Sequence, residues 1–375
     1  MTPLKMLDVG DDPFERGLLH GRKLAQEVLE NAETYFAMFL SNGLSREEAL
    51  AEGARWLPAI RECDISYAEE MRGIATGAEV PEALVGMLNA RYEIAFSLFG
   101  AEARRSDAAL EPEGCTSFGL MPESTADGST ILGQNWDWLA GVQGGTVVLR
   151  ITRISGPDII SLNEAGIVGG KQGFNSAGIG LVENGLVSNH DGINSYTAPF
   201  HLRCRQILEA ETYDHALLPV LKTKRTCSAN YVVGHADGEI IDMETSPNKV
   251  TYQYPKDGIV THSNHFTDDG HGESQMERIG PSTLFRSVRL RRLLEKNNGS
   301  LNSESIAECL KDHFGFPHAL CRHPDERQPE ARRTMTNSAV IIDLNRQTLA
   351  VTDGPPCESS FMEFGFDQEV TVAAE

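Results

Sequence analysis

Residues 114–120 read GCTSFGL, and the chain changes character at this point. Residues 101–114, which end at the glycine of this stretch, carry charges, alanines and one proline with no apolar period, and we expect them to form an exposed connection. The stretch precedes short apolar runs separated by glycine, aspartate and proline, a pattern typical of strands joined by tight turns. A buried strand is therefore predicted to begin at a cysteine.

The Gly114–Cys115 peptide bond has the residue types that self-cleavage needs. Gly114 has no side chain to crowd the approach of the Cys115 thiol to the carbonyl carbon, and glycine tolerates a strained backbone. An N-to-S acyl shift followed by hydrolysis would leave Cys115 as a new N-terminus. Because an α-amino group titrates at about 7.7 to 8.0, one residue would then supply both nucleophile and base. On this bond alone, an ordinary buried strand cysteine remains the alternative.

The chain before the cysteine is predicted to be helical. Apolar residues recur at three-and-four spacing from Phe14 to about Gly100. Ser45 and Asp64 are predicted N-caps, and Pro81 is predicted to open a further helix from its first position. We expect residues 1–114 to form a mostly helical portion.

The chain after the cysteine is predicted to form a catalytic core, residues 115–375, in which strands and helices come in blocks. Strand-like runs are interrupted by helical patterns at about 198–221, 281–296 and 302–313. Such blocks favour an α+β fold in which helices cover the outer faces of sheets.

Charge and targeting signals narrow the possible partners. The chain has 33 Lys+Arg against 54 Asp+Glu, a formal net charge of -21, which disfavours nucleic acid and anionic membranes. The short basic run RSVRLRR, residues 286–292, is interpreted as the solvated face of a helix. The N-terminal sequence lacks a signal-peptide pattern and no window approaches the roughly 18 apolar residues of a membrane span, so a cytoplasmic protein is expected.

Weaker signals are interpreted as structural. The seven cysteines are odd in number and contain no CxxC, which argues against a disulfide framework or a zinc ribbon. His262, His265 and His271 fit no HExxH pattern and are interpreted as polar loop residues. Ser176 in GFNSAG lacks the spacing of a nucleophile elbow and is assigned to a turn. No metal ligand and no cofactor is predicted.

Several motifs follow one another in a specific order. They are DPFERGLLHGRKLA, GCTSFGL, DGSTILGQNWDW, EAGIVGGKQGFNSAGIGLVENG, ANYVVGHADGEIIDMETSP, VTHSNH and FPHALCR. Together they resemble the acyl-coenzyme A:6-aminopenicillanic acid acyltransferase family of cysteine N-terminal nucleophile hydrolases, over nearly the whole chain. The resemblance implies a four-layer αββα sandwich and autocatalytic scission just before Cys115. The fragments 1–114 and 115–375 would stay associated as an αβ heterodimer.

The resemblance also implies the catalytic residues. Cys115 would be the nucleophile, and Asp137 in QNWDW would accept a hydrogen bond from its α-ammonium. Asn264 in HSNH would donate to the developing oxyanion. Arg322 in ALCR would lie near the nucleophile, favour its thiolate and bind a substrate carboxylate or carbonyl.

Three further residues are given supporting roles. Ser117 is expected to assist the cleavage of the Gly114–Cys115 bond through its hydroxyl. Trp138 is expected to form a wall of an acyl pocket, and Glu183 to select a cationic or amine-bearing ligand. The substrate would be a small N-acyl amide or acyl thioester whose acyl group passes to water or an amine. Coenzyme A would enter only as a substrate carrier.

Two other interpretations stay open. A penicillin V acylase or bile-salt hydrolase type would share the fold and chemistry, but its mature chain normally begins with a cysteine close to the N-terminus. The 114 residues before Cys115 argue against it. An uncleaved homologue that serves as a binding protein would keep Cys115 as a plain strand residue, and the intact mass separates this case from the enzyme.

Overall fold

A computed structural model describes residues 4–103, 114–274 and 276–367. Its helices are α1 (Pro13–Lys23), α2 (Ala25–Ser41), α3 (Arg46–Cys63), α4 (Ile65–Gly77), α5 (Glu82–Asn89), α6 (Arg91–Ala103), α7 (Phe200–Leu208), α8 (Tyr213–Lys222), α9 (Met276–Ile279), α10 (Thr283–Glu295) and α11 (Ser303–Leu310). Its strands are β1 (Lys5–Val9), β2 (Thr116–Leu120), β3 (Ile131–Leu139), β4 (Thr146–Ile151), β5 (Ile159–Glu164), β6 (Gln172–Asn175), β7 (Ile179–Gly185), β8 (Ala229–His235), β9 (Glu239–Ser246), β10 (Lys249–Gln253), β11 (Ile259–His262), β12 (Thr334–Asp343), β13 (Thr348–Val351) and β14 (Met362–Gly365).

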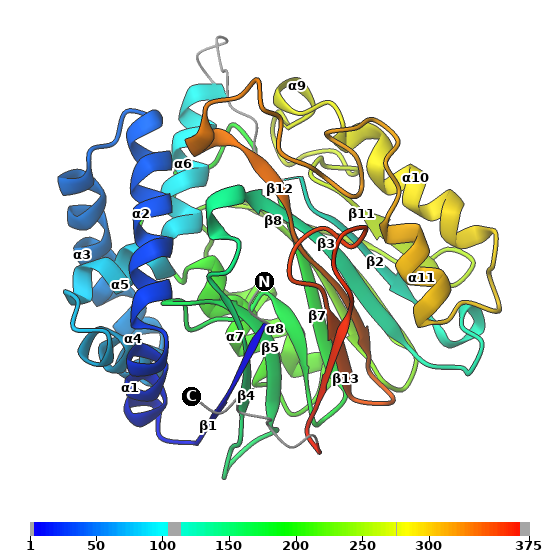
Figure 1. The fold of residues 1–375 in the computed structure, drawn as a ribbon, viewed down its shortest axis with the longest axis horizontal. Helices are drawn as coiled ribbons and strands as arrows, with labels where there is room; N and C mark the ends of the chain where they lie inside the picture. The colour runs from blue at the N-terminus through cyan, green and yellow to red at the C-terminus, as the bar shows by residue number, and fades with distance from the viewer. Residues whose placement is uncertain (1–3, 104–113, 275, 368–375) are drawn as a thin grey trace.

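The strands form two sheets. In the described residues the eight-stranded sheet has the order β1-β4-β5-β6-β7-β8-β9-β10, and the six-stranded sheet the order β11-β2-β3-β12-β13-β14. Helices α1 to α6 lie on one side of the molecule and α10 and α11 on the other, with the strands between them (Figure 1). The blocks of strands and helices predicted from the sequence are confirmed.

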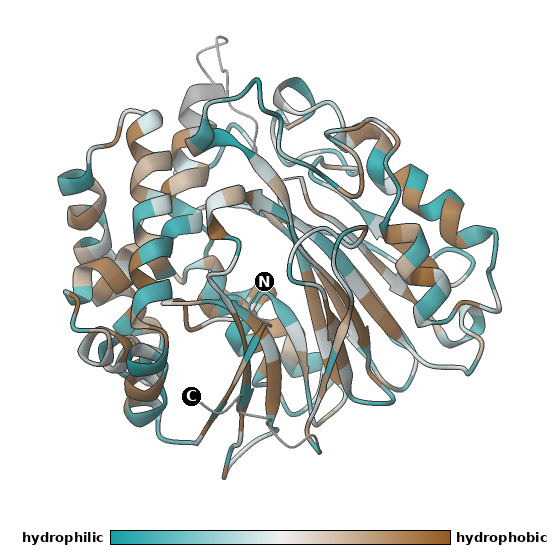
Figure 2. Cartoon of the chain, viewed as in Figure 1, coloured by the Kyte–Doolittle hydropathy of each residue, from teal (hydrophilic) through white to brown (hydrophobic). Residues whose placement is uncertain are grey.

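Three hydrophobic cores separate four layers. In β4, Val147 belongs to the core shared with the N-terminal helices, whereas its neighbour Val148 belongs to the core between the two sheets. In β12, Val340 faces the core between the sheets and Ile341 faces the core under α10 and α11. Because successive strand residues point to opposite faces, these apolar runs are buried on both sides. Figure 2 shows the resulting concentration of hydrophobic residues along the strands. The predicted αββα arrangement is confirmed.

The helix starts follow the predicted caps, with one shift. Ser45 forms a capping box with Glu48 at the start of α3, and the side chain of Asp64 accepts a hydrogen bond from the backbone N–H of Tyr67 at 2.9 Å. Pro81 was predicted as the first helical residue of its helix. It is instead the residue before α5, because its ψ of 141° is extended.

Strand β1 was not predicted. It lies at the edge of the eight-stranded sheet and pairs in parallel with β4, with Lys5 opposite Val147 and Val9 opposite Ile151. The portion before the cysteine is thus tied to the catalytic core by a strand as well as by packed helices.

Two further expectations concern the exposed connection before Cys115 and the lack of a membrane span. Helix α6 extends to Ala103, so the expected exposed connection begins later than predicted, and residues 104–113 lie outside the described residues. Within the described part of the chain, the helices are too short or too polar to cross a bilayer.

Candidate active site

Cys115 directly precedes β2, which begins one residue later than predicted, and is fully buried. Strands β2 and β3 pair antiparallel, with Thr116 opposite Asn135, so the end of β3 that carries Asp137 lies beside the cysteine. The Cys115 Sγ is 3.7 Å from the backbone oxygen of Asp137. The hairpin therefore brings together two residues that the resemblance singled out.

Arg286, on α10, contacts the Gly114–Cys115 bond directly. Its Nη1 donates to the carbonyl oxygen of Gly114, to that of Cys115 at 2.6 Å and to Thr116 Oγ1 at 2.7 Å. The residue is only 1% exposed. A carbonyl that receives a guanidinium donor is polarised toward nucleophilic attack, and the negative charge that develops on its oxygen is stabilised.

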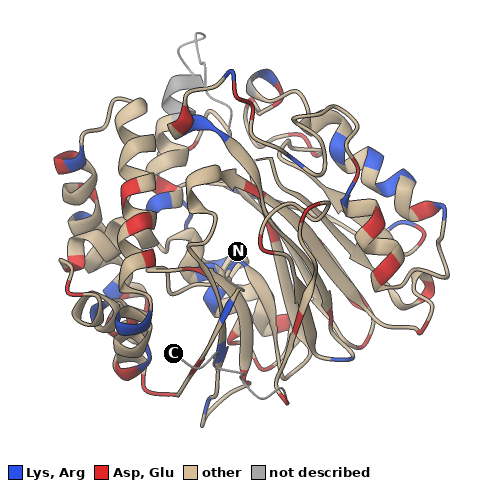
Figure 3. Cartoon of the chain, viewed as in Figure 1, with Lys and Arg blue, Asp and Glu red and all other residues tan. Residues whose placement is uncertain are grey.

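The sequence interpretation of the run that contains Arg286 was wrong for this residue. Basic residues are spaced along α10 (Figure 3), and Arg292 is exposed as expected. Arg286, however, precedes Leu290 and Leu294 at four-residue spacing, and both leucines are buried in the core under α10. That spacing places Arg286 on the apolar, buried stripe of the helix. The four-residue spacing in the sequence could therefore have indicated that Arg286 is buried.

Arg322 packs directly against Gly114. A Cβ atom at position 114 would lie 2.5 Å from the Cζ, Nε and Nη2 atoms of this guanidinium, so a side chain there would collide with it. The Nε of Arg322 donates to the Asp137 carboxylate at 3.3 Å, and Nη1 donates to Thr334 Oγ1 at 3.1 Å. The absence of a side chain at Gly114 therefore lets the Arg322 guanidinium lie directly against the backbone.

Asp137 is a buried carboxylate within this cluster. Its Oδ1 accepts a hydrogen bond from Thr336 Oγ1 at 2.6 Å, and its Oδ2 accepts the bond from Arg322. Burial raises the pKa of Asp137 to about 6, although Arg322 and then Arg286 act in the opposite direction. Two guanidinium groups and one carboxylate leave the surroundings of Cys115 cationic, which favours a thiolate and an oxyanion.

Asn264 is connected to the same cluster through Arg286. Its Oδ1 accepts a hydrogen bond from Arg286 Nη2 at 2.7 Å, and its Nδ2 donates to the backbone oxygen of Gly185 at 3.0 Å. The bond to Gly185 uses one of the two N–H groups of the side-chain amide. The Asn264 amide is thus held in a fixed orientation beside the guanidinium.

Ser117 and Trp138 are held by other contacts. The Ser117 hydroxyl donates to Asn184 Oδ1 on β7, across the interface between the sheets. The indole Nε1 of Trp138 donates to the Tyr35 hydroxyl at 2.8 Å, and the Arg91 guanidinium lies 5.0 Å from the ring centroid. Thr116, which the sequence did not single out, is the hydroxyl residue that contacts Arg286.

Glu183 faces away from this cluster. It is adjacent to Asn184 on β7, and successive side chains of a strand point to opposite faces. Asn184 contacts Ser117. Burial raises the pKa of Cys204 on α7, and the charge of Glu183 raises it further, so Glu183 lies on the α7 side of the sheet. The structure therefore brings Gly114, Asp137, Asn264 and Arg322 together around Cys115, and it does not bring Glu183 to them.

The three histidines between residues 262 and 271 each have separate protein partners. His262 Nε2 lies 2.8 Å from Glu244 Oε1, His265 Nδ1 lies 2.9 Å from Thr283 Oγ1, and His271 Nε2 lies 2.7 Å from Thr251 Oγ1. His265 and His271 lie in a loop, as the sequence predicted, whereas His262 is the last residue of β11 and is fully buried, so the loop prediction was wrong for it.

The fold and the site together define an enzyme of the N-terminal nucleophile hydrolase class. A buried cysteine directly precedes a strand of an αββα sandwich, a glycine precedes the cysteine, and a guanidinium donates to the carbonyl oxygen of that glycine. The chain belongs to the acyl-coenzyme A:6-aminopenicillanic acid acyl-transferase family, which matches residues 124–356.

Similar proteins include one fungal relative and several solved structures. Over 313 residues the chain is 32% identical to the 40 kDa form of acyl-coenzyme A:6-aminopenicillanic-acid-acyltransferase of Emericella nidulans, covering 82% of this chain and 76% of that protein. A mutant of the conjugated bile acid hydrolase of Clostridium perfringens is 10% identical with a TM-score of 0.47, covering 68% and 93% of the two chains. Penicillin V acylase of Agrobacterium tumefaciens is 14% identical with a TM-score of 0.46, covering 68% and 87%. At these values the two structural similarities add no weight to the family assignment.

Proposed function

We propose that the chain cleaves its own Gly114–Cys115 bond and then uses Cys115 to hydrolyse or transfer the acyl group of a small N-acyl amide or acyl thioester. The observation that carries the proposal is the Arg286 guanidinium on the Gly114 carbonyl oxygen, beside a thiol that belongs to the next residue. Membership of an acyltransferase family supports the acyl chemistry.

We assign the self-cleavage step to these residues as follows. The Cys115 Sγ attacks the Gly114 carbonyl carbon, and the negative charge that forms on the carbonyl oxygen is stabilised by Arg286. The bond from the Gly114 carbon to the Cys115 nitrogen then breaks, and that nitrogen takes up a proton in place of the one that the thiol lost. Water hydrolyses the resulting thioester, which leaves a carboxylate on Gly114 and a thiol and amine on Cys115.

In turnover, the liberated α-amine accepts the proton of the Cys115 thiol, and the thiolate attacks the substrate carbonyl. We assign Arg286 and the remaining N–H of the Asn264 amide to the oxyanion, and Asp137 to the α-ammonium. The amine then protonates the leaving group. Water or an amine takes the acyl group from Cys115, and we take water as the default acceptor.

The two fragments are proposed to remain together as an αβ heterodimer. Strand β1 of the first fragment pairs with β4 of the second, and helices α1 to α6 share one core with the eight-stranded sheet. The Tyr35 hydroxyl also contacts both Glu164 and Trp138 across the cleavage point of the chain.

The proposal is tested by denaturing mass spectrometry of the wild type and of Cys115→Ala, followed by assays on N-acyl amines and acyl thioesters. We expect the wild type to give two polypeptides and acyl release, and Cys115→Ala to give one inactive chain. Cys63→Ser is a matched control, since Cys63 is exposed at the end of α3. An intact wild-type chain without turnover would instead support the binding-protein interpretation.

A further inference from the structure

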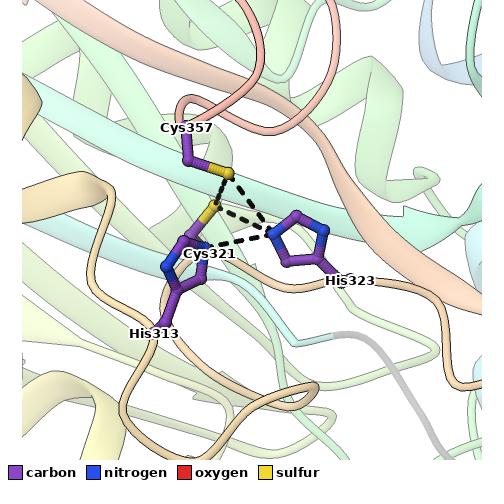
Figure 4. A group of neighbouring side chains, drawn as sticks. All are labelled: His313, Cys321, His323 and Cys357. Atoms are coloured by element: carbon purple, nitrogen blue, oxygen red, sulfur yellow. Dashed lines mark hydrogen bonds between the residues drawn. The ribbon is translucent and has the colours of Figure 1, made fainter.

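Two histidines and two cysteines meet near Arg322, outside the catalytic cluster. His313, Cys321 and His323 lie on the segment that follows α11, and Cys357 lies in the connection between β13 and β14 (Figure 4). One ligand atom from each of the four side chains lies within 4.8 Å of those of the other three. None of these residues belongs to the proposed acyl chemistry.

Four of the six distances between these atoms lie within about 0.2 Å of the range of edge lengths in a small coordination tetrahedron. His313 Nε2 and His323 Nε2 are 3.1 Å apart, and Cys321 Sγ and Cys357 Sγ are 3.4 Å apart. The His323 Nε2 lies 3.7 Å from Cys321 Sγ and 3.4 Å from Cys357 Sγ. A tetrahedral zinc ion, with Zn–S of about 2.3 Å and Zn–N of about 2.0 to 2.1 Å, would place its ligand atoms about 3.3 to 3.8 Å apart.

The surroundings orient the ligands. The Nδ1 of His323 lies 3.4 Å from Glu358 Oε1, an arrangement that fixes which ring nitrogen is directed to a metal. The backbone N–H of Cys321 donates to the backbone oxygen of Asp312, and that of His323 donates to the backbone oxygen of Pro317, both at 3.0 Å. The segment is therefore folded back on itself with its ligands on one side.

The group of four side chains is closed by the protein on one side and open to solvent on the other. Cys321 is buried, whereas His313 and Cys357 are exposed, so an ion can arrive from solvent. Two thiolates and two imidazoles form the donor set of structural zinc sites, and such sites take all four ligands from the protein.

We propose that His313, Cys321, His323 and Cys357 bind one structural zinc ion. The ion would join the segment after α11 to the connection between β13 and β14. Arg322 lies between two of the ligands, so the ion would also fix the segment that carries this guanidinium to Gly114 and Asp137. The site departs from the sequence-based expectation of no metal, because its ligands come from two segments without a CxxC pair.

Metal analysis of the full-length protein, purified without chelator, tests the proposal. We expect about one zinc per chain in the wild type and in Cys63→Ser, and roughly a tenth of that or less in Cys357→Ser and His313→Ala. Both substituted positions are exposed, so the variants are expected to fold. Zinc retained at the wild-type level in both variants would overturn the proposal.

A second measurement needs no variant. Cobalt added to the zinc-free wild type should give thiolate-to-cobalt charge transfer and the intense visible bands of a tetrahedral ion, and Cys63→Ser should give the same spectrum. A weak octahedral spectrum would contradict the site. A Cys321–Cys357 disulfide would also contradict the site, because oxidised sulfurs cannot bind zinc as thiolates. It would appear, in protein prepared under reducing conditions, as an intact mass lower by two hydrogens and as a cross-linked peptide.

Discussion

Replacing Arg286 by lysine should slow self-cleavage far more than it changes the fold. In the native chain one guanidinium donates to the Gly114 and Cys115 carbonyl oxygens, to Thr116 and to Asn264. Lysine keeps the charge but loses the planar fork, so the donor on the Gly114 oxygen is displaced. The loss of one oxyanion donor costs about 10²- to 10³-fold in rate, and we expect the half-time of cleavage to lengthen by that factor.

The assay follows newly made protein after translation is stopped, and denaturing mass spectrometry measures the fraction of chains opened at Cys115. Arg292→Lys is the control, because Arg292 is exposed on the same helix. Buried acceptors left without a donor cost about 1 to 3 kcal/mol each, so thermal unfolding of both variants is needed to show that they are folded. Cleavage of a folded Arg286→Lys chain at the wild-type rate would refute the assignment of Arg286 to the scissile carbonyl.

Three further perturbations test separate parts of the account. Gly114→Ala should leave the chain uncleaved in mass spectra, because the added methyl group would lie 2.5 Å from the Arg322 guanidinium; rapid cleavage would contradict the packing described. Asn264→Ala should lower kcat by roughly a hundredfold or more while the protein is still cleaved, and unchanged turnover would remove Asn264 from the oxyanion site. The Glu244–His262 pair predicts a pH dependence of stability. Burial alone would lower the pKa of His262, but Asp242 and Glu244 raise it to about 9. The folded pKa lies above the ordinary 6.5, so the stabilisation is complete below about pH 6.5 and is lost as the pH rises through about 9. It amounts to about 3 kcal/mol. Urea unfolding of Cys115→Ala at both pH values should show this loss, and the additional His262→Gln change should abolish it.

The start of β2 could be predicted to within one residue from local signals, whereas the αββα layer order came from the family resemblance. The change from a charged stretch to apolar runs at Cys115 lies in the sequence itself, as do the caps at Ser45 and Asp64. The strands buried on both faces read as continuous apolar runs.

What could not be predicted depends on long-range contacts. Strand β1 finds its partner more than a hundred residues later, at the edge of a sheet, where little in its own five residues indicates pairing. Arg286 reaches Gly114 only because α10 packs over the six-stranded sheet. The alternation of side chains along β7 turns Glu183 away from Cys115. Which residues of GIGLVENG face the cysteine depends on how the strand pairs with its neighbours, and the segment alone does not show this.

The cysteine–histidine cluster was missed for the same reason. Pattern searches for metal sites rely on short spacings, and Cys357 joins the other three ligands only through the hairpin of β13 and β14. The sequence interpretation of the cysteines rested on their odd number and on the absence of a CxxC pair.

The most direct measurement is N-terminal sequencing of purified protein that releases acyl groups. The account predicts a second sequence that opens Cys-Thr-Ser-Phe from residue 115, and its disappearance together with activity in Cys115→Ala. An active preparation that consists of one uncleaved chain, with no sequence opening at Cys115, would contradict the claim that this residue becomes the catalytic N-terminus.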